Sequence, residues 1–361
     1  MMITAGNGFI EQSDRYAFNN AGESLKKYIL LECGELAYNH GASKLRPYGS
    51  CFALTTVEKA RIPFVYHCFS VEKSNPEFLS IELNGANVEN QLRKIVSSGA
   101  RMDGLLNIAY SEYTEVTVQL PKKEEQDWIA KFFKQLDTLI TLHQRKYEKL
   151  VNIKKSMLDK MFPQNGASVP EIRFKGFTDP WEQRKLEEYL EVSGQKNFEG
   201  IYTKEDVLSV SGDFGIVNQI EFQGRSFAGA SVANYGVVET GDIVYTKSPL
   251  KSNPYGIIKA NKGKNGIVST LYAVYKPKQS ANPEFVQIYF EQDARMNNYM
   301  HPLVNKGAKN DMKVSAENAL KGQIVFPDIK EQRTISEFFR NLDTLITLHQ
   351  RKLEKLQNIK K

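Results

Sequence analysis

Two polar loops in this 361-residue chain carry residue types that can contact a polyanion. One reads YNHGASKLRPYG and the other YTKSPLKSNPYG, about 207 residues further on. Both combine cations, amides and an aromatic ring, and such side chains contact phosphates and base edges. The candidate contact residues are Asn39, His40, Lys44, Arg46 and Tyr48 in the first loop, and Lys247, Ser248, Lys251, Asn253 and Tyr255 in the second.

Further cations stand at a basic turn, Lys262 and Lys264, and at one pair of matching positions, Arg101 and Lys309. These could add phosphate contacts. The alternative for any one of these residues is an ordinary solvated loop side chain. The binding interpretation is favoured because the basic loops recur at matching sites while their residues differ, as two readers of different sequences would require.

No catalytic constellation is present in the sequence. The KGKNG turn lacks the spacing of a phosphate-binding loop, and neither a nucleophile elbow nor a His-Glu-x-x-His motif occurs. Ser252–Tyr255 partly matches the Asn-Pro-Pro-Tyr motif of amino-group DNA methyltransferases. The second proline is missing, and Arg46 takes the place of Asn253 in the other copy. We therefore predict no catalytic residue.

The cysteines and histidines also lack the spacing of a metal site. The three cysteines, Cys33, Cys51 and Cys68, form no framework, which favours reduced thiols in the cytoplasm. His67 beside Cys68 is not a ligand spacing. We predict no bound metal and no cofactor held by this chain.

A long repeated segment must position these loops. It runs over Pro121–Lys155 and again over Pro327–Lys361, with about 24 of 35 residues identical, and the stretch LDTLITLHQRK is unchanged. Each copy starts after a proline with acidic residues in its first turn, as a helix does. The first helix is expected to run to about Phe162, which is too long for one small module to cover.

Apolar residues at three- and four-residue intervals predict a coiled-coil seam on each helix. We expect the two helices to pair antiparallel; the alternative is that each packs only on its own module. The two histidines are expected to be polar seam residues, not catalysts. The predicted seam consists of Ile129, Phe132, Leu136, Leu139, His143, Leu150, Ile153, Ile335, Phe338, Leu342, Leu345, His349, Leu356 and Ile359.

Weaker matches extend the duplication into the segments that precede each helix, including NPEF at Asn75 and again at Asn282. The fold class is therefore α+β: two duplicated β-rich modules separated by a long antiparallel helix pair. In the second module we expect strands at 236–239, 242–247, 255–259, 266–275 and 323–326, and a helix over 283–295. The predicted domains are a first module (1–120), a first helix (121–163), a linker (164–180), a second module (181–326) and a second helix (327–361).

Composition sets only wide limits on function. The net charge of +6 permits an acidic partner without requiring one. No apolar run is long enough to span a bilayer, and the first residues do not have the pattern of a secretory signal. We expect a cytoplasmic protein with no membrane partner.

The chain contains the same arrangement twice: a diverged module, then a proline, the motif Glu-Gln-x-x-Ile and a nearly invariant helix. This arrangement resembles the specificity subunit of type I restriction–modification systems. The matching residues are Pro121, Glu125, Gln126 and Ile129, and Pro327, Glu331, Gln332 and Ile335. The bridging stretch Pro170–Tyr189 is similar to the entry into a second recognition domain in such subunits.

The resemblance implies that each module recognises one half of a bipartite double-stranded DNA target, while the helices set the spacer length. It implies two modification subunits, which methylate adenine with S-adenosylmethionine, and two restriction subunits, which use ATP and Mg²⁺. Residues 181–208 have no counterpart in the first module, so we expect that module to be incomplete. The second repeated helix stops at Lys361, whereas the first continues through SMLDKMF, so we expect the second helix to be short. The alternatives are a coiled-coil scaffold with protein- or glycan-binding modules, and an enzyme with an unrecognised site.

Overall fold

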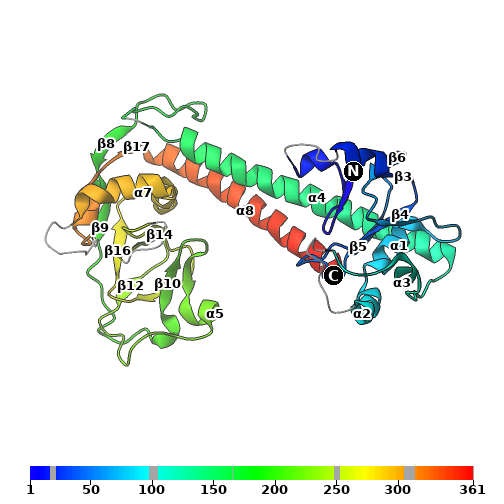
Figure 1. The fold of residues 1–361 in the computed structure, drawn as a ribbon. Coiled ribbons are helices and arrows are strands. Elements are labelled where there is room, and N and C mark those ends of the chain that lie inside the picture. Colours follow the sequence, from blue (N-terminus) through cyan, green and yellow to red (C-terminus); the bar gives the residue numbers. More distant parts are fainter. Residues whose placement is uncertain (17–21, 97–104, 165, 248–252, 305–313, 361) are drawn as a thin grey trace. The chain divides into compact units, whose positions relative to one another are not determined.

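The computed structural model describes residues 1–16, 22–96, 105–164, 166–247, 253–304 and 314–360. It contains two compact units (Figure 1). Unit 1 comprises Met1–Leu142 with Leu356–Lys361, and unit 2 comprises His143–Lys355. Among the described residues, no helix has the length and apolar character needed to cross a membrane.

Unit 1 is built from short antiparallel strands and three short helices. β1 (Met2–Thr4) pairs with β2 (Gly8–Ile10), and β3 (Ile29–Glu32) pairs with β6 (Lys59–Ile62). β4 (Leu36–Asn39) lies between β5 (Ser50–Ala53) and β7 (His67–Phe69). The helices α1 (Pro76–Leu83), α2 (Ala86–Ile95) and α3 (Tyr110–Thr114) follow. Two apolar clusters form the core, one around Leu36 and Tyr38 and the other around Leu31 and Ile62.

Unit 2 contains a four-stranded antiparallel sheet in the order β14–β13–β16–β9. Its strands are β9 (Leu190–Val192), β13 (Ile243–Thr246), β14 (Ile258–Ala260) and β16 (Tyr272–Pro277). Three further antiparallel pairs are β8 (Glu182–Lys185) with β17 (Gln323–Phe326), β10 (Leu208–Ser211) with β11 (Gly215–Asn218), and β12 (Gly236–Val238) with β15 (Gly266–Val268). The helices are α5 (Gln219–Gln223), α6 (Pro283–Tyr289) and α7 (Asp293–Met300).

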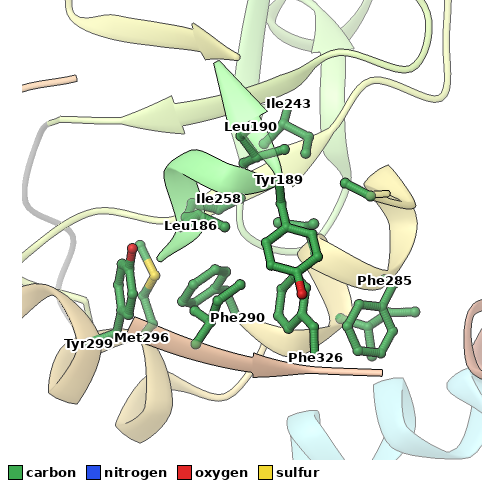
Figure 2. Packing of buried hydrophobic residues seen from close by; sticks show 14 of the residues in the cluster. Leu186, Tyr189, Leu190, Ile243, Ile258, Phe285, Phe290, Met296, Tyr299 and Phe326 are labelled. Carbon is green, nitrogen blue, oxygen red and sulfur yellow. The ribbon is translucent and has the colours of Figure 1, made fainter. Parts of the chain in front are cut away.

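Two long helices complete the fold: α4 (Lys123–Lys160) and α8 (Ile329–Lys360). The boundary between the units falls within each of them. The main core of unit 2 joins the sheet to α6, α7, β17 and the start of α8. Figure 2 shows Tyr189, Phe285, Phe290 and Phe326 packed together in this core; Phe285 lies in α6, Phe290 directly follows α6, and Phe326 ends β17.

Matching backbone conformations and matching tyrosine hydrogen bonds show the duplication in the two modules. Gly34 and Gly241 both have φ +92°, and Gly49 and Gly256 have φ +83° and +84°, each pair 207 residues apart. The hydroxyl of Tyr38 donates to the carbonyl of Tyr48 at 2.6 Å, and that of Tyr245 donates to the carbonyl of Tyr255 at 2.7 Å. The predicted α+β fold with duplicated modules is confirmed, whereas the limits of the five predicted domains stay predictions.

Several predicted elements differ from the observed ones. The expected helix over 283–295 is two helices, because Gln292 adopts an extended backbone (ψ 121°) and starts α7 as its N-cap. The expected strand over 266–275 is divided into β15 and β16, which pair with different neighbours. The strand expected at 255–259 starts only at Ile258, because Gly256 turns the chain before it.

Replacing Gly256 with alanine should destabilise unit 2 strongly. A β-carbon at Gly256 would lie 1.7 Å from the carbonyl oxygen of Thr246, so the backbone would have to move. Gly241 has a similarly positive φ with no atom near its β-carbon position, so Gly241→Ala is the matched control. We expect the control to lose about 1–2 kcal/mol of unfolding free energy from strain alone and Gly256→Ala to lose clearly more, as measured by denaturant unfolding. Equal losses would contradict the clash.

Candidate functional site

A buried glutamine joins each module to its long helix. In unit 1, Gln126 accepts a hydrogen bond from the backbone N–H of Asn75 at 2.9 Å and donates to the carbonyl of Pro121 at 2.9 Å. In unit 2, Gln332 accepts from the N–H of Asn282 at 2.8 Å and donates to the carbonyl of Pro327 at 2.9 Å. An unpaired buried amide would be costly, so these bonds hold each helix start in one position against its module.

An ion pair adds to this connection about two turns further along each helix. Lys134 of α4 contacts Glu77 of α1 at 2.7 Å, and Arg340 of α8 contacts Glu284 of α6. The two pairs are counterparts in the duplication. Glu–Gln-x-x-Ile is thus a structural motif in both copies, and its glutamine is the residue that holds the module.

The two long helices are antiparallel where unit 2 contains both of them. His143 faces His349, with their Nδ1 atoms 2.8 Å apart, and Lys154 pairs with Asp343 at 2.8 Å. Within unit 1, Lys360 pairs with Asp137. Asp137 and Asp343 are counterparts, as are Lys154 and Lys360, so each unit contains the same kind of ion pair once. His143 contacts its own counterpart, His349. Within unit 2, a local twofold axis of the helix pair therefore passes between the two imidazoles.

The buried stripe of the helices differs in part from the predicted seam. Leu136 and Leu342 are buried, His143, Leu150, Ile153, His349 and Leu356 are half-buried, and Ile335 and Phe338 pack in the unit 2 core. Leu139 and Leu345 are 44% and 45% exposed, and Phe132 and Ile359 are also exposed. Ile140 and Ile346 are half-buried in place of Leu139 and Leu345, because the helices alternate four- and three-residue steps from Leu136 and Leu342. Ile129 is half-buried.

In the first polar loop, most of the predicted contact residues stabilise the loop itself. Asn39 donates to the carbonyl of Ile3 at 3.2 Å and accepts from the N–H of Gly41. His40 is buried, with its ring nitrogens 2.8 and 2.9 Å from two carbonyl oxygens. Arg46 donates to the carbonyl of Asn84 at 2.6 Å, and Tyr48 is half-buried. Lys44 alone among these five is exposed.

In the described part of the second polar loop, the predicted contact residues also make contacts within their own module. Asn253 is buried and donates to the carboxylate of Asp293 at 2.6 Å. Lys247 donates to the carbonyl of Thr270 at 2.8 Å, and Tyr255 is half-buried against His301. Ser248, Lys251, Arg101 and Lys309 lie outside the described residues. Lys262 and Lys264 are exposed on the turn after β14, with Lys262 3.5 Å from Glu284.

Sequence reasoning missed a set of exposed aromatic residues in unit 2. The rings of Phe214 and Phe222 lie 5.2 Å apart, and the guanidinium of Arg225 lies 4.6 Å from the ring of Phe227. Phe214, Phe222 and Phe227 are all exposed. The signal was the stretch FQGRSF, in which phenylalanines flank an arginine at the end of a short helix. Exposed aromatic side chains beside a cation suit stacking on bases or insertion between base steps.

The titratable groups form no metal-binding cluster within the described part of the chain. Burial raises the pKa of the Cys51 thiol to about 12, so this cysteine is held as a neutral core residue. Burial also raises the pKa of the Cys68 thiol, to about 11. A thiol with a raised pKa stays protonated at neutral pH and is a poor nucleophile.

Several known proteins are similar to this chain. The chain is 22% identical over 365 residues to a putative type I restriction enzyme specificity subunit, MjaX, of Methanocaldococcus jannaschii, covering 94% of this chain and 78% of that protein. The HsdS subunit of Thermoanaerobacter tengcongensis is 16% identical in sequence, with 91% of this chain and 79% of that chain covered and a TM-score of 0.46.

The type I restriction–modification S subunit of M. genitalium is 12% identical, with 92% and 82% of the two chains covered and a TM-score of 0.49. No family model matches the chain. The resemblance to type I specificity subunits that the sequence indicated is confirmed by the curated relative, whose similarity runs through both modules and both helices.

The histidine pair should make the helix pair less stable at mildly acidic pH. Partial burial, with the charges of His143, Lys146 and Lys352, lowers the pKa of His349 below its usual value. The unfolded chain therefore protonates first as the pH falls through about 6.5, and stability decreases. We expect His349→Gln to reduce the fall in the denaturant midpoint between pH 7.5 and 5.5.

The pKa of His67 in unit 1 is also lowered by burial, so the pH effect must be taken as the difference between the variant and the unchanged protein. His301→Gln, at an exposed position in unit 2, is the control. An identical pH dependence in all three proteins would show that the pair does not respond to pH.

Proposed function

We propose that this chain is a non-catalytic, DNA-binding specificity subunit of a type I restriction–modification complex. The similarity to a specificity subunit over 94% of the chain carries this proposal. The duplicated modules, each fastened to a long helix by the same glutamine, support it, because a bipartite DNA target needs two readers joined by a spacer. Each module would recognise one half-site, and the helix pair would set the length between the halves.

The exposed cations offer the first candidate contacts with DNA. Lys44 stands on the first polar loop, and Lys262 and Lys264 stand on a turn of the second module. The buried or bonded residues Asn39, His40, Arg46 and Asn253 would shape these surfaces instead of reading bases directly. The exposed phenylalanines near Arg225 would provide apolar contact in the second module. This division suits DNA recognition, where lysines contact phosphates and loop shape determines which groups reach the bases.

The helices supply two equivalent surfaces for partner subunits. Leu139 and Leu142 are exposed on α4, and their counterparts Leu345 and Leu348 are exposed on α8. Exposed leucines at a helical spacing indicate a protein contact. Because the two surfaces have the same sequence, they would bind two copies of the same partner. We assign this partner as the adenine methyltransferase subunit, which would use S-adenosylmethionine. Two restriction subunits would join with ATP and Mg²⁺, and the assembly would work in the cytoplasm.

Removing Lys262 and Lys264 should weaken binding to DNA in a salt-dependent way. With both lysines changed to alanine, we expect the slope of log affinity against log salt to fall by about 2, because each phosphate contact contributes about 1. Titration of a fluorescent duplex at several salt concentrations measures this slope. Lys175→Ala, an exposed lysine in the linker, should leave the slope unchanged. A slope unaffected by the double change would remove this turn from the DNA interface.

Blocking one leucine surface should remove one partner and leave the other. We expect Leu345→Glu with Leu348→Glu to reduce the co-purified methyltransferase from two copies per chain to one, as measured by native mass spectrometry. Thr347→Glu, at an exposed position on another face of the same helix, should retain two. Retention of both copies by the double variant would place the partners elsewhere.

A further inference from the structure

Unit 2 covers the start of its long helix with a segment that precedes the second module. This covering segment comprises Met157–Lys185, that is, the end of α4, the linker and β8. Beneath it, Phe326, Phe339 and Ile335 are almost completely buried, and Glu331 is 1% exposed. A glutamate so deeply buried requires a partner of opposite charge.

The covering segment supplies that charge and an aromatic lining. Arg173 donates to both carboxylate oxygens of Glu331 at 2.8 Å in a bidentate pair. The ring of Phe162 lies 6.2 Å from that of Phe339, and the ring of Phe174 lies 5.8 Å from that of Phe338. β8 then pairs with β17 along four residues, which completes the cover with main-chain hydrogen bonds.

Unit 1 contains the same receiving groups at the offset of 206 residues, but they are uncovered. Glu125 is the counterpart of Glu331 and is exposed. Phe132, the counterpart of Phe338, is 52% exposed, and Leu120, the counterpart of Phe326, is also exposed. Residues 117–120, which correspond to β17, are not in a strand. We call Leu120, Glu125, Ile129, Phe132 and Phe133 the acceptor face.

The acceptor face has the same framework as its covered counterpart. The Gln126–Asn75 bond and the Lys134–Glu77 pair reproduce the geometry found around Gln332 and Arg340. The contacts of Gln126 and Lys134 that frame the face are therefore formed without a cover. An apolar surface with an exposed glutamate at its edge is complementary to a segment that carries an arginine between aromatic residues.

We propose that the acceptor face of unit 1 binds a polypeptide segment of the same chemistry as the covering segment. Its arginine would pair with Glu125, its phenylalanines would pack on Phe132 and Phe133, and a short extended stretch would pair with residues 117–120. The covering segment of a second copy is a poorer candidate, because it is already engaged with its own α8. The occupant that we propose is a segment from outside residues 1–361 in which the Phe-Pro and Arg-Phe pattern is not already engaged.

The test uses the full chain and a synthetic peptide with the sequence of residues 157–185. The chain has two tryptophans: Trp128, 72% exposed and one helical turn from Glu125 and Phe132, and Trp181, buried in unit 2. With the chain labelled at tryptophan with ¹⁵N, the unlabelled peptide should shift the Trp128 indole signal in a saturable manner and leave Trp181 unchanged. Trp128→Phe assigns the signals.

Charge exchange makes the test specific. A peptide with Arg173→Glu should bind the unchanged chain at least tenfold more weakly than the original peptide does. The chain variant Glu125→Arg should restore the binding of this altered peptide. The chain variant Glu124→Arg, changed at the neighbouring exposed position, should not restore this binding. A shift of Trp181 alone, no saturable shift at millimolar peptide, or binding that is indifferent to Glu125 would each overturn the proposal. Light scattering without peptide gives one further contradicting outcome. If the unchanged chain were dimeric and the Glu125→Arg variant monomeric, a second copy would occupy the face and the proposal would be overturned.

Discussion

The hydrogen bonds of one buried glutamine in each copy determine how module and helix fit together. Gln126 and Gln332 lie one turn into their helices, and each joins the helix start to the loop that begins α1 or α6. The asparagine of that loop also caps the short helix through its side chain. Movement of the glutamine would therefore leave buried polar groups unpaired on both elements. This constraint explains why the sequence around it is shared by two modules that otherwise differ widely.

The helix pair follows a different rule from the modules. Its ion pairs, Asp137 with Lys360 and Lys154 with Asp343, are the same interaction made twice. A change in one copy would break one of two matched pairs, so the two helix sequences are restrained together. No such relation connects the polar loops, because Arg46 bonds to a helix-end carbonyl and its counterpart Asn253 bonds to Asp293. The modules can thus diverge while the helices remain alike.

Much of the architecture could be predicted from the sequence, because long amphipathic helices and an internal repeat give strong periodic signals. The register of the helix pair was harder to predict from the sequence. Leu139 and Ile140 are both apolar, and either of them can continue a seam from Leu136 to His143. Exposure of Leu139 can be known only once the partner helix is in place. The loop residues were harder still. Asn39, His40 and Arg46 have the chemistry of DNA contacts, but the same donors and acceptors satisfy the loop's own backbone, and only the folded path of the chain separates these two uses.

The contact between His143 and His349 has a consequence for symmetry at the atomic level. Two copies of one helix can be related by a twofold axis in every heavy atom, but the bond between their Nδ1 atoms holds one proton, and that proton belongs to one ring at a time. The helix pair therefore has two arrangements of nearly equal energy, with donor and acceptor exchanged. Identical sequences on either side of the axis make a structure whose heavy atoms are symmetric and whose hydrogen bonding is not.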